Sequence, residues 1–193
     1  MNQEVLDTPT TSALQEFIAA LDLLSKANFP VDAVTQFLKT SPLAPKTLKP
    51  YIFFSRQRYT RNLLFKCPSY EILLLCWQPG QVSPIHGHEG EKCWMRVEQG
   101  ELHFINYNVK EINGKSFVEV EHEATGNTGF VDGPAVVHRV ENTSLEPALS
   151  LHLYARPLSK CDIFDKEHKT KHQIPLRYDS VGGKLLNVPL VQE

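Results

Sequence analysis

Histidines at positions 86 and 88 are the residues of this chain best placed to do chemistry. On an extended strand, residues i and i+2 point to the same face, so the two imidazoles would lie roughly 6.5 Å apart along the chain. Turn signals at Pro79-Gly80 and Gln99-Gly100 bracket the pair, as a β-hairpin requires. His138 ends the apolar run 134–137 and is predicted to lie on another strand. The side chains of His86, His88 and His138 therefore predict a metal site built from two strands.

Three neutral imidazoles leave a divalent metal ion its full double positive charge, whereas two histidines and a carboxylate would cancel half of it. Such a site favours an anionic ligand, and a thiol qualifies because coordination to a metal removes its proton at neutral pH. Three protein ligands also leave coordination positions open. If Cys93 joined the histidines, the four nitrogen and sulfur ligands would instead satisfy a closed tetrahedral zinc site. The residues alone allow both a reactive site and a zinc-binding protein without redox chemistry.

The spacing of these residues carries a family resemblance. The pattern Gly80-x5-His86-x-His88-x4-Cys93-x6-Gly100, followed by His138-x3-Asn142, resembles the two metal motifs of the cupin superfamily, most of whose members have glutamate where Cys93 stands. The resemblance narrows to cysteine dioxygenase type I, the iron enzyme that oxidises cysteine to cysteine sulfinic acid. It rests on Cys93 together with the segments Tyr59-Thr60-Arg61-Asn62-Leu63, Leu75-Cys76-Trp77, His138-Arg139-Val140-Glu141-Asn142 and Ser150-Leu151-His152-Leu153-Tyr154, and it runs from about Tyr51 to about Tyr178.

This resemblance implies the ligands and the role of each residue. It implies Fe(II) bound by His86, His88 and His138, with L-cysteine and O₂ as partners. The substrate would bind the iron through its thiolate and amine, while Arg61 grips its carboxylate through paired charge-assisted hydrogen bonds and Tyr59 assists. Tyr154, His152 and Ser150 alternate along one predicted strand, and the family uses these positions as a hydrogen-bonded relay beside the substrate. Cys93 and Tyr154 match the pair that forms a thioether crosslink in family members, so that bond is predicted.

One departure from the family pattern affects the prediction. The animal enzymes follow the catalytic tyrosine with Ser-Pro-Pro, whereas this chain has Ala155-Arg156-Pro157, and Arg156 adds a second cation to this region. The related 3-mercaptopropionate dioxygenases share the lack of that proline but usually have glutamine in place of the arginine, so Arg61 favours cysteine. The alternatives are a dioxygenase for another small thiol, such as 3-mercaptopropionate or cysteamine, and a cupin that binds zinc or a ligand without oxidising it.

Composition agrees with a small-molecule enzyme. The 193 residues, 41% of them hydrophobic, are predicted to form a single cupin domain with a substantial core. Twenty basic residues against 22 acidic ones create no field that would attract nucleic acid or an anionic membrane. No stretch approaches the roughly 20 apolar residues that span a bilayer, and the polar start is unlike a signal peptide. Together with four irregularly spaced cysteines, predicted to be free thiols, this indicates a cytoplasmic protein, expected to be a monomer.

The elements expected to position these residues are a helical lead and a β body. Apolar residues at helical spacing predict a helix from Ser12 to Ser25, with Ser12 and Gln15 as a capping box. A second helix follows Pro30 and ends at the proline-rich segment 41–45. These helices, within residues 1–50, are expected to pack on a β-barrel spanning 51–180. Short runs rich in β-formers predict strands at 58–64, 71–78, 92–97, 101–109, 116–122, 135–140 and 149–154, with a type I′ hairpin at Asn113-Gly114. The predicted fold is mainly β, a cupin-type antiparallel barrel or jelly roll.

Overall fold

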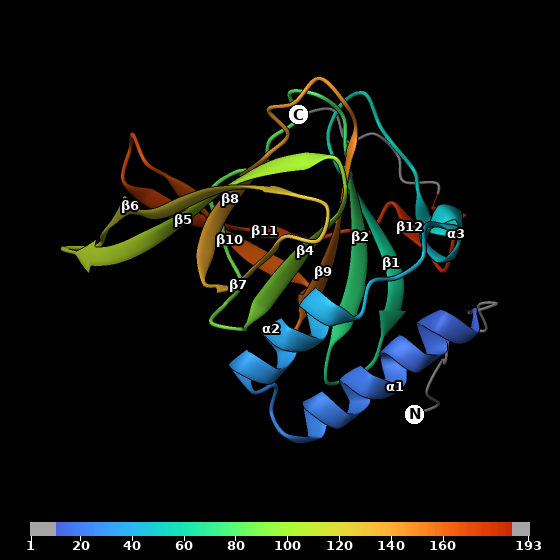
Figure 1. Ribbon diagram of the computed structural model, residues 1–193. Coiled ribbons are helices and arrows are strands. Elements are labelled where there is room, and N and C mark those ends of the chain that lie inside the picture. The colour runs from blue at the N-terminus through green and yellow to red at the C-terminus, as the bar shows by residue number, and fades with distance from the viewer. Residues whose placement is uncertain (1–10, 187–193) are drawn as a thin grey trace.

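A computed structural model describes residues 11–186 as two β-sheets with short helices at the N-terminal end (Figure 1). The helices are α1 (Ser12–Lys26), α2 (Val31–Thr40) and α3 (Pro45–Leu48), followed by the 3-10 turn Lys49–Tyr51. The strands are β1 (Thr60–Lys66), β2 (Glu71–Trp77), β3 (His86–Gly87), β4 (Cys93–Gln99), β5 (Glu101–Ile112), β6 (Lys115–Asn127), β7 (Val131–Ala135), β8 (Val137–Glu141), β9 (Ala148–Tyr154), β10 (Lys160–Asp165), β11 (Thr170–Pro175), β12 (Ser180–Val181) and β13 (Lys184–Leu185).

The strands divide into a seven-stranded sheet, in the order β13-β12-β1-β2-β9-β4-β7, and a six-stranded sheet, in the order β11-β10-β3-β8-β5-β6. Within the described residues every strand pair is antiparallel except β1 with β12. All residues of β2 and β9 are buried, which explains their nearly continuous apolar sequences. The expected mainly β, antiparallel jelly-roll architecture is confirmed.

The long hairpin of β5 and β6 extends away from the body of the molecule (Figure 1). Asn113 and Gly114 connect the two strands, and both have positive φ, at 51° and 72°. Positive φ at both central residues is the requirement of a type I′ turn, so the predicted hairpin is confirmed.

Helices α1 and α2 cover the outer face of the seven-stranded sheet (Figure 1). Leu14, Phe17 and Leu21 of α1 are buried, as are Val34 and Leu38 of α2, at spacings that place each set on one helix face. The predicted cap at Ser12 is wrong, because Ser12 is already helical. Thr11 has the extended backbone that a cap needs, and its Oγ1 accepts a hydrogen bond from the Leu14 N–H at 3.4 Å.

Strand β4 is attached to these helices through every second side chain. Lys92, just before the strand, donates to the carbonyls of Asn28 and Phe29, Trp94 donates to Thr35 Oγ1, and Arg96 donates to the carbonyls of Leu38 and Ser41. The intervening residues Cys93, Met95 and Val97 face the opposite way, into a second core cluster. The helical layer therefore holds the strand that presents Cys93 to the interior.

The predicted strands 101–109 and 116–122 are longer in the structure, as β5 and β6, and two further differences have identifiable reasons. The run 135–140 is split at Val136, which is exposed, because β7 pairs with β4 in one sheet while β8 pairs with β3 and β5 in the other. The predicted strand at 58–64 begins two residues later, at Thr60, because residues 56–58 form a bend. Within residues 11–186, no helix combines the length and the apolar character needed to cross a membrane.

Candidate metal centre and pocket

The three predicted metal-binding histidines meet where β3 and β8 pair. His86 on β3 lies directly opposite His138 on β8, and His88 follows β3 immediately. The Nε2 atoms of His86 and His138 are 3.1 Å apart, and one nitrogen from each of the three rings lies within 4.8 Å of the others. Spacing along one strand combined with strand pairing thus produces the converging cluster that the sequence predicted.

Hydrogen bonds to the backbone orient two of the rings. His86 Nδ1 is 3.0 Å from the Pro84 carbonyl, and His88 Nδ1 is 3.2 Å from the Ala135 carbonyl. A carbonyl can only accept, so each Nδ1 carries the proton and each Nε2 is left with a free lone pair. The buried Nε2 of His88 has no hydrogen-bond partner among the residues that the structure describes. An unpartnered, inward-facing lone pair in a histidine cluster fits a metal ligand.

Burial keeps these imidazoles neutral. It lowers the pKa of His86 to about 4 and that of His88 to about 3, and it also lowers the pKa of His138 well below 6.5. Metal binding requires the unprotonated ring, so at pH 7 the cluster needs no proton release before it takes up an ion. The donor set therefore fits a divalent transition metal.

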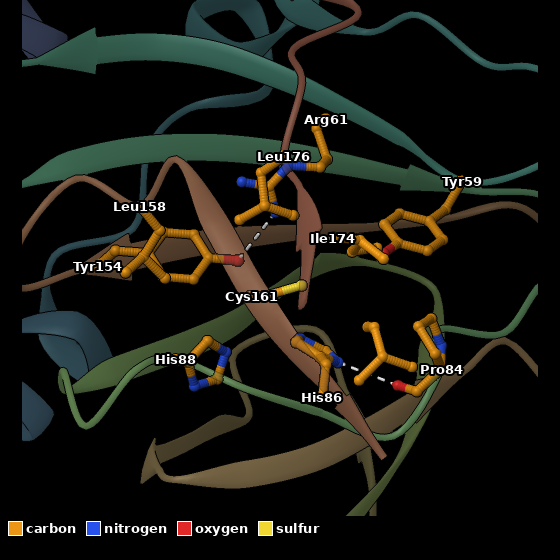
Figure 2. A pocket seen from close by; sticks show the side chains of 11 residues that line it. Tyr59, Arg61, Pro84, His86, His88, Tyr154, Leu158, Cys161, Ile174 and Leu176 are labelled. Carbon is orange, nitrogen blue, oxygen red and sulfur yellow. Dashed lines mark hydrogen bonds between the residues drawn. The ribbon is translucent and has the colours of Figure 1, made fainter. Parts of the chain in front are cut away.

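A cavity of about 30 Å³ opens beside the histidines (Figure 2). His86 and His88 lie on one side of it and Arg61 and Tyr59 on the other, with the Tyr154 hydroxyl pointing toward Arg61. The remaining walls are largely apolar. The cavity is lined by Tyr59, Arg61, Pro84, His86, His88, Tyr154, Leu158, Cys161, Ile163, Ile174 and Leu176. Its lining, with one buried cation among apolar walls, suits a small ligand with an anionic end.

Arg61 is a buried cation that forms no ion pair with any acidic group among residues 11–186. Its side chain extends from β1 into the cavity, and Nη1 donates to the Tyr154 hydroxyl at 3.4 Å, while the buried Nε and Nη2 donate to no protein group within that range. Burial by itself lowers the pKa of Arg61, but the opposing effects of Tyr154, Tyr59 and Glu71 are larger together. The net pKa is therefore raised, and the guanidinium stays charged. Leaving buried charged donors unpaired is costly, and an anionic ligand would satisfy them.

A chain of hydrogen bonds runs along β9 away from the cavity. The Tyr154 hydroxyl is 3.4 Å from His152 Nδ1, and His152 Nε2 is 2.8 Å from Ser150 Oγ. Trp77 Nε1 donates to the same serine oxygen at 2.9 Å. Burial raises the pKa of Tyr154 and lowers that of His152, so both side chains are neutral at pH 7. The period of two on a strand, which predicted a shared face, brings these three side chains together.

Cys93 and Tyr154 lie opposite each other on the paired strands β4 and β9. Both are buried, and burial raises the pKa of the Cys93 thiol. Cys93 is not part of the group in which the three histidine nitrogens converge. The closed zinc site with four protein ligands is therefore not the arrangement that the structure favours. Tyr59, the least specific of the predicted residues, lines the cavity and stacks on Trp77 with ring centroids 4.4 Å apart.

Several cavity residues escaped sequence reasoning. Leu158, Ile174 and Leu176 resemble ordinary core residues in the sequence, and Cys161 was expected only to be a free thiol, which it is. The alternation of Cys161 and Ile163 is a weak strand signal that could have indicated β10. Arg156 lies elsewhere: its side chain is exposed, forms an ion pair with Glu91 at 3.4 Å, and does not line the cavity.

The buried side chain of His152 on β9 predicts that the stability of the protein depends on pH. Unfolding returns the pKa of His152 to about 6.5, well above its value in the folded protein. Below pH 6.5 the unfolded protein therefore binds a proton at this residue that the folded protein does not bind. We expect this residue to reduce the free energy of unfolding of the metal-free protein by about 1.4 kcal/mol for each pH unit below 6.5. Denaturant unfolding between pH 7.5 and 5 should show a shallower pH slope for His152→Gln than for the wild type. The exposed His122→Gln is the control, and an equal slope for wild type and His152→Gln would contradict the prediction.

Comparisons with known proteins agree with this geometry. The family model described as cysteine dioxygenase type I matches residues 1–167. The rat protein named cysteine dioxygenase type 1 is 29% identical over 157 residues, covering 79% of this chain and 78% of the relative. The human protein of that name is 28% identical over 184 residues, covering 93% and 91%. Among solved structures, a Klebsiella pneumoniae protein with a double-stranded β-helix domain is 18% identical, covers 59% of this chain and 89% of its own, and has a TM-score of 0.46.

Proposed function

The chain belongs to the cysteine dioxygenase type I family and is an oxidoreductase of that class, and from this premise we propose that it oxidises L-cysteine with O₂ to cysteine sulfinic acid. The proposed cofactor is Fe(II), held by His86, His88 and His138. One observation carries the substrate assignment: the charged, buried and unpaired guanidinium of Arg61 faces the same small cavity as the metal-binding histidines.

Each part of L-cysteine has a counterpart in this cavity. The substrate carboxylate would meet Arg61, whose free Nε and Nη2 donors can form the paired hydrogen bonds that a carboxylate prefers. Tyr59 would border the same end of the substrate. Bound Fe(II) would supply the open coordination positions at which thiolate, amine and dioxygen can be held together. The apolar side chains of Leu158, Ile163 and Leu176 would exclude bulk water from the reacting sulfur.

The hydrogen bonds from Tyr154 through His152 to Ser150 support a role for Tyr154 in holding a proton beside the substrate. Its hydroxyl keeps its proton at neutral pH because burial raises the pKa, and it lies between Arg61 and His152. We assign Tyr154 to hydrogen bonding with the bound substrate. His152 and Ser150 would hold the orientation of the tyrosine hydroxyl, with Trp77 fixing the serine.

A thioether between Cys93 Sγ and the Tyr154 ring is part of the proposal. Its formation breaks the S–H bond and one ring C–H bond and creates one S–C bond, and the two electrons and two protons released would reduce one dioxygen to hydrogen peroxide. We expect the iron-loaded protein, after aerobic turnover with L-cysteine, to contain a fraction whose intact mass is lower by two hydrogen atoms. Cys93→Ser and Tyr154→Phe should each abolish that fraction. Mass spectrometry that finds only the unchanged mass in turned-over wild type would show that the bond does not form.

A second small-thiol substrate is the alternative that the cavity also accommodates. 3-Mercaptopropionate carries a thiol and a carboxylate, so Arg61 would hold it too, and only the amine of cysteine distinguishes the two. Cysteamine lacks the carboxylate. We expect oxygen uptake by the Fe(II)-loaded protein to rank L-cysteine first, and preference for 3-mercaptopropionate would assign the cavity to the other thiol. No uptake with any of the three would favour a protein that binds metal without oxidising a thiol.

The proposal also includes the cellular setting. A nearly balanced charge, with 20 basic and 22 acidic residues, supports small molecules as partners in place of nucleic acid or an anionic membrane. We propose a monomeric, cytoplasmic enzyme with a role in cysteine breakdown.

A further inference from the structure

The strand that carries Arg61 is bordered on one side by a short segment from the end of the described chain. β1 pairs with β2 along its length, but its other edge meets only the two-residue strand β12, which runs parallel to it. The contact is nevertheless well bonded. Ser180 Oγ donates to Asn62 Oδ1 at 2.8 Å in a buried position, and the Gly182 N–H donates to the Leu63 carbonyl at 2.9 Å.

Asp179 takes both backbone hydrogen bonds of Arg61 on this edge. The Arg61 N–H donates to Asp179 Oδ2 at 2.8 Å, and the Asp179 N–H donates to the Arg61 carbonyl at 2.8 Å. A carboxylate acceptor makes the first of these a charge-assisted hydrogen bond. On the edge of β1 that faces away from β2, the Arg61 main chain is thus held by one residue 118 positions later in the sequence, and this contact helps to set the direction in which the side chain leaves the strand.

The same carboxylate binds the segment on the other side of Tyr59. Arg58 donates to Asp179 through both terminal nitrogens, from Nη2 to Oδ1 at 2.6 Å and from Nη1 to Oδ2 at 3.1 Å, and its Nη1 also donates to the Tyr59 carbonyl at 3.0 Å. The Asp179 side chain is 16% exposed and that of Arg58 is 54% exposed. Asp179 therefore joins Arg58 and Arg61, the residues that flank the cavity-lining Tyr59.

The neighbouring residues anchor Asp179 to the cavity wall. The Tyr178 hydroxyl donates to the fully buried carboxylate of Glu71, which also accepts from the Leu158 N–H at 3.1 Å. The Leu176 N–H donates to the Ser159 carbonyl at 2.8 Å. Leu158 and Leu176 both line the cavity. Residues 176–179 are thereby fixed at several points, so Asp179 is a firm support for β1.

We propose that Asp179 is a positioning residue that sets the carboxylate selectivity of the cavity by fixing the main chain of Arg61 and the adjoining Tyr59. The argument rests on the proposed function insofar as Arg61 receives the substrate carboxylate. A displacement of a substrate-holding group by about 1 Å costs up to roughly a hundredfold in rate, so the loss of this support has a large expected effect.

The test compares Asp179→Ala with Asp179→Asn and Arg58→Gln. Asp179→Ala removes the acceptor of the Arg61 N–H, and we expect the KM for L-cysteine to rise roughly ten- to hundredfold while kcat changes little. The KM for cysteamine, which has no carboxylate, should stay the same. Asp179→Asn keeps an acceptor oxygen but loses the negative charge. Arg58→Gln keeps Asp179 but removes the two hydrogen bonds that Arg58 donates to it. Both variants should therefore raise the KM for L-cysteine by less than Asp179→Ala does. Glu119→Ala, which breaks an exposed ion pair with Lys110, is the matched control and should leave both KM values unchanged.

A second measurement reports on Arg61 without any catalysis. In the metal-free, ¹⁵N-labelled protein, the Nε–H signal of Arg61 is assigned by its loss in Arg61→Gln. We expect this signal to shift or broaden in Asp179→Ala and to be unchanged in Glu119→Ala. If Asp179→Ala does not fold, the smaller changes in Asp179→Asn decide the question by the same two readouts.

The outcomes separate this inference from the proposed function. An unchanged KM for L-cysteine and an unmoved Arg61 signal in the Asp179 variants would overturn the positioning role, even if Arg61→Gln raises the KM. Equal increases in KM for cysteine and cysteamine would also overturn it, because they indicate a general loss of the cavity. If Arg61→Gln itself leaves the KM for L-cysteine unchanged, the carboxylate role in the proposed function fails, and the Nε–H signal alone decides whether Asp179 positions Arg61.

Discussion

Replacement of His138 by alanine is expected to abolish both metal retention and oxygen uptake. His138 is fully buried, and its Nε2 lies 3.1 Å from that of His86, so alanine at this position would remove one of the three converging nitrogen ligands. Removal of an outer partner of a metal ligand already lowers affinity 10- to 100-fold, so the loss of one of three ligands should exceed about a hundredfold. Metal content after gel filtration and Fe(II) titration would measure the effect.

The control for this variant is another histidine replaced in the same way. His122 is exposed on β6 and contributes no ligand atom to the cluster, so His122→Ala should retain metal and activity. Thermal unfolding of both metal-free variants would show whether they fold. A folded His138→Ala protein that binds iron as tightly as the wild type would remove this histidine from the site.

Arg61→Gln should lower the preference for L-cysteine by one to two orders of magnitude. Hydrogen bonds to charged groups contribute about 1.5–3 kcal/mol, which corresponds to a KM for cysteine raised roughly ten- to 150-fold. Glutamine is neutral and cannot supply the forked, charged donors, and Arg61→Lys should restore little because an ammonium group lacks the planar geometry. Oxygen uptake at varied L-cysteine and cysteamine would measure the change, since only the former has a carboxylate to lose.

Arg61→Gln is expected to weaken substrate binding without weakening the folded state. The guanidinium of Arg61 is buried, and the described part of the chain gives it no acidic partner, which is unfavourable when no ligand is bound. Arg61→Gln should therefore leave the free energy of unfolding of the ligand-free protein unchanged or raise it.

A cysteine preference equal to that of the wild type in a stably folded Arg61→Gln variant would refute the assigned role of Arg61 in binding the substrate carboxylate.

The two sheets contribute different halves of the site. The six-stranded sheet carries the histidine cluster, with His86 on β3, His138 on β8 and His88 directly after β3, whereas the seven-stranded sheet carries Arg61 on β1, Cys93 on β4 and Tyr154 on β9. The histidine cluster and the residues proposed to bind the substrate are thus built on separate sheets. This division explains why a change at Arg61 is expected to alter the choice of substrate while leaving the metal cluster intact.

Local sequence patterns sufficed for most of the longer strands and for the residues that share a strand face, but they missed β3 and the strands after β9. Ser150, His152 and Tyr154 follow from a period of two, and the hairpin at Asn113-Gly114 follows from the backbone freedom of those residue types. The position of His138 opposite His86 depends on pairing between segments about 50 residues apart, which the family resemblance supplied and local patterns do not. The split at Val136 also required knowledge of both sheets, because a continuous apolar run does not reveal a change of partner.

Most of the site formed by residues after Tyr154 could not be predicted, and only β10 left a weak strand signal. All residues of β11 are exposed, so its sequence lacks the alternation that marks a half-buried strand, although Ile174 borders the cavity. Asp179 looks like an ordinary loop aspartate, and its contact with Arg61 spans 118 residues. Such contacts leave no periodic signal, because a single hydrogen bond between distant segments imposes no pattern on the residues around it.

The most direct test of the proposed activity is the origin of the oxygen atoms in the product. Fe(II)-loaded protein is incubated with L-cysteine under ¹⁸O₂ in ordinary water, and the products are identified by mass. The proposed function predicts cysteine sulfinic acid that carries two labelled oxygen atoms, with formation lost in His138→Ala. Product that contains oxygen from water, or conversion of cysteine only to its disulfide, would contradict a dioxygenase.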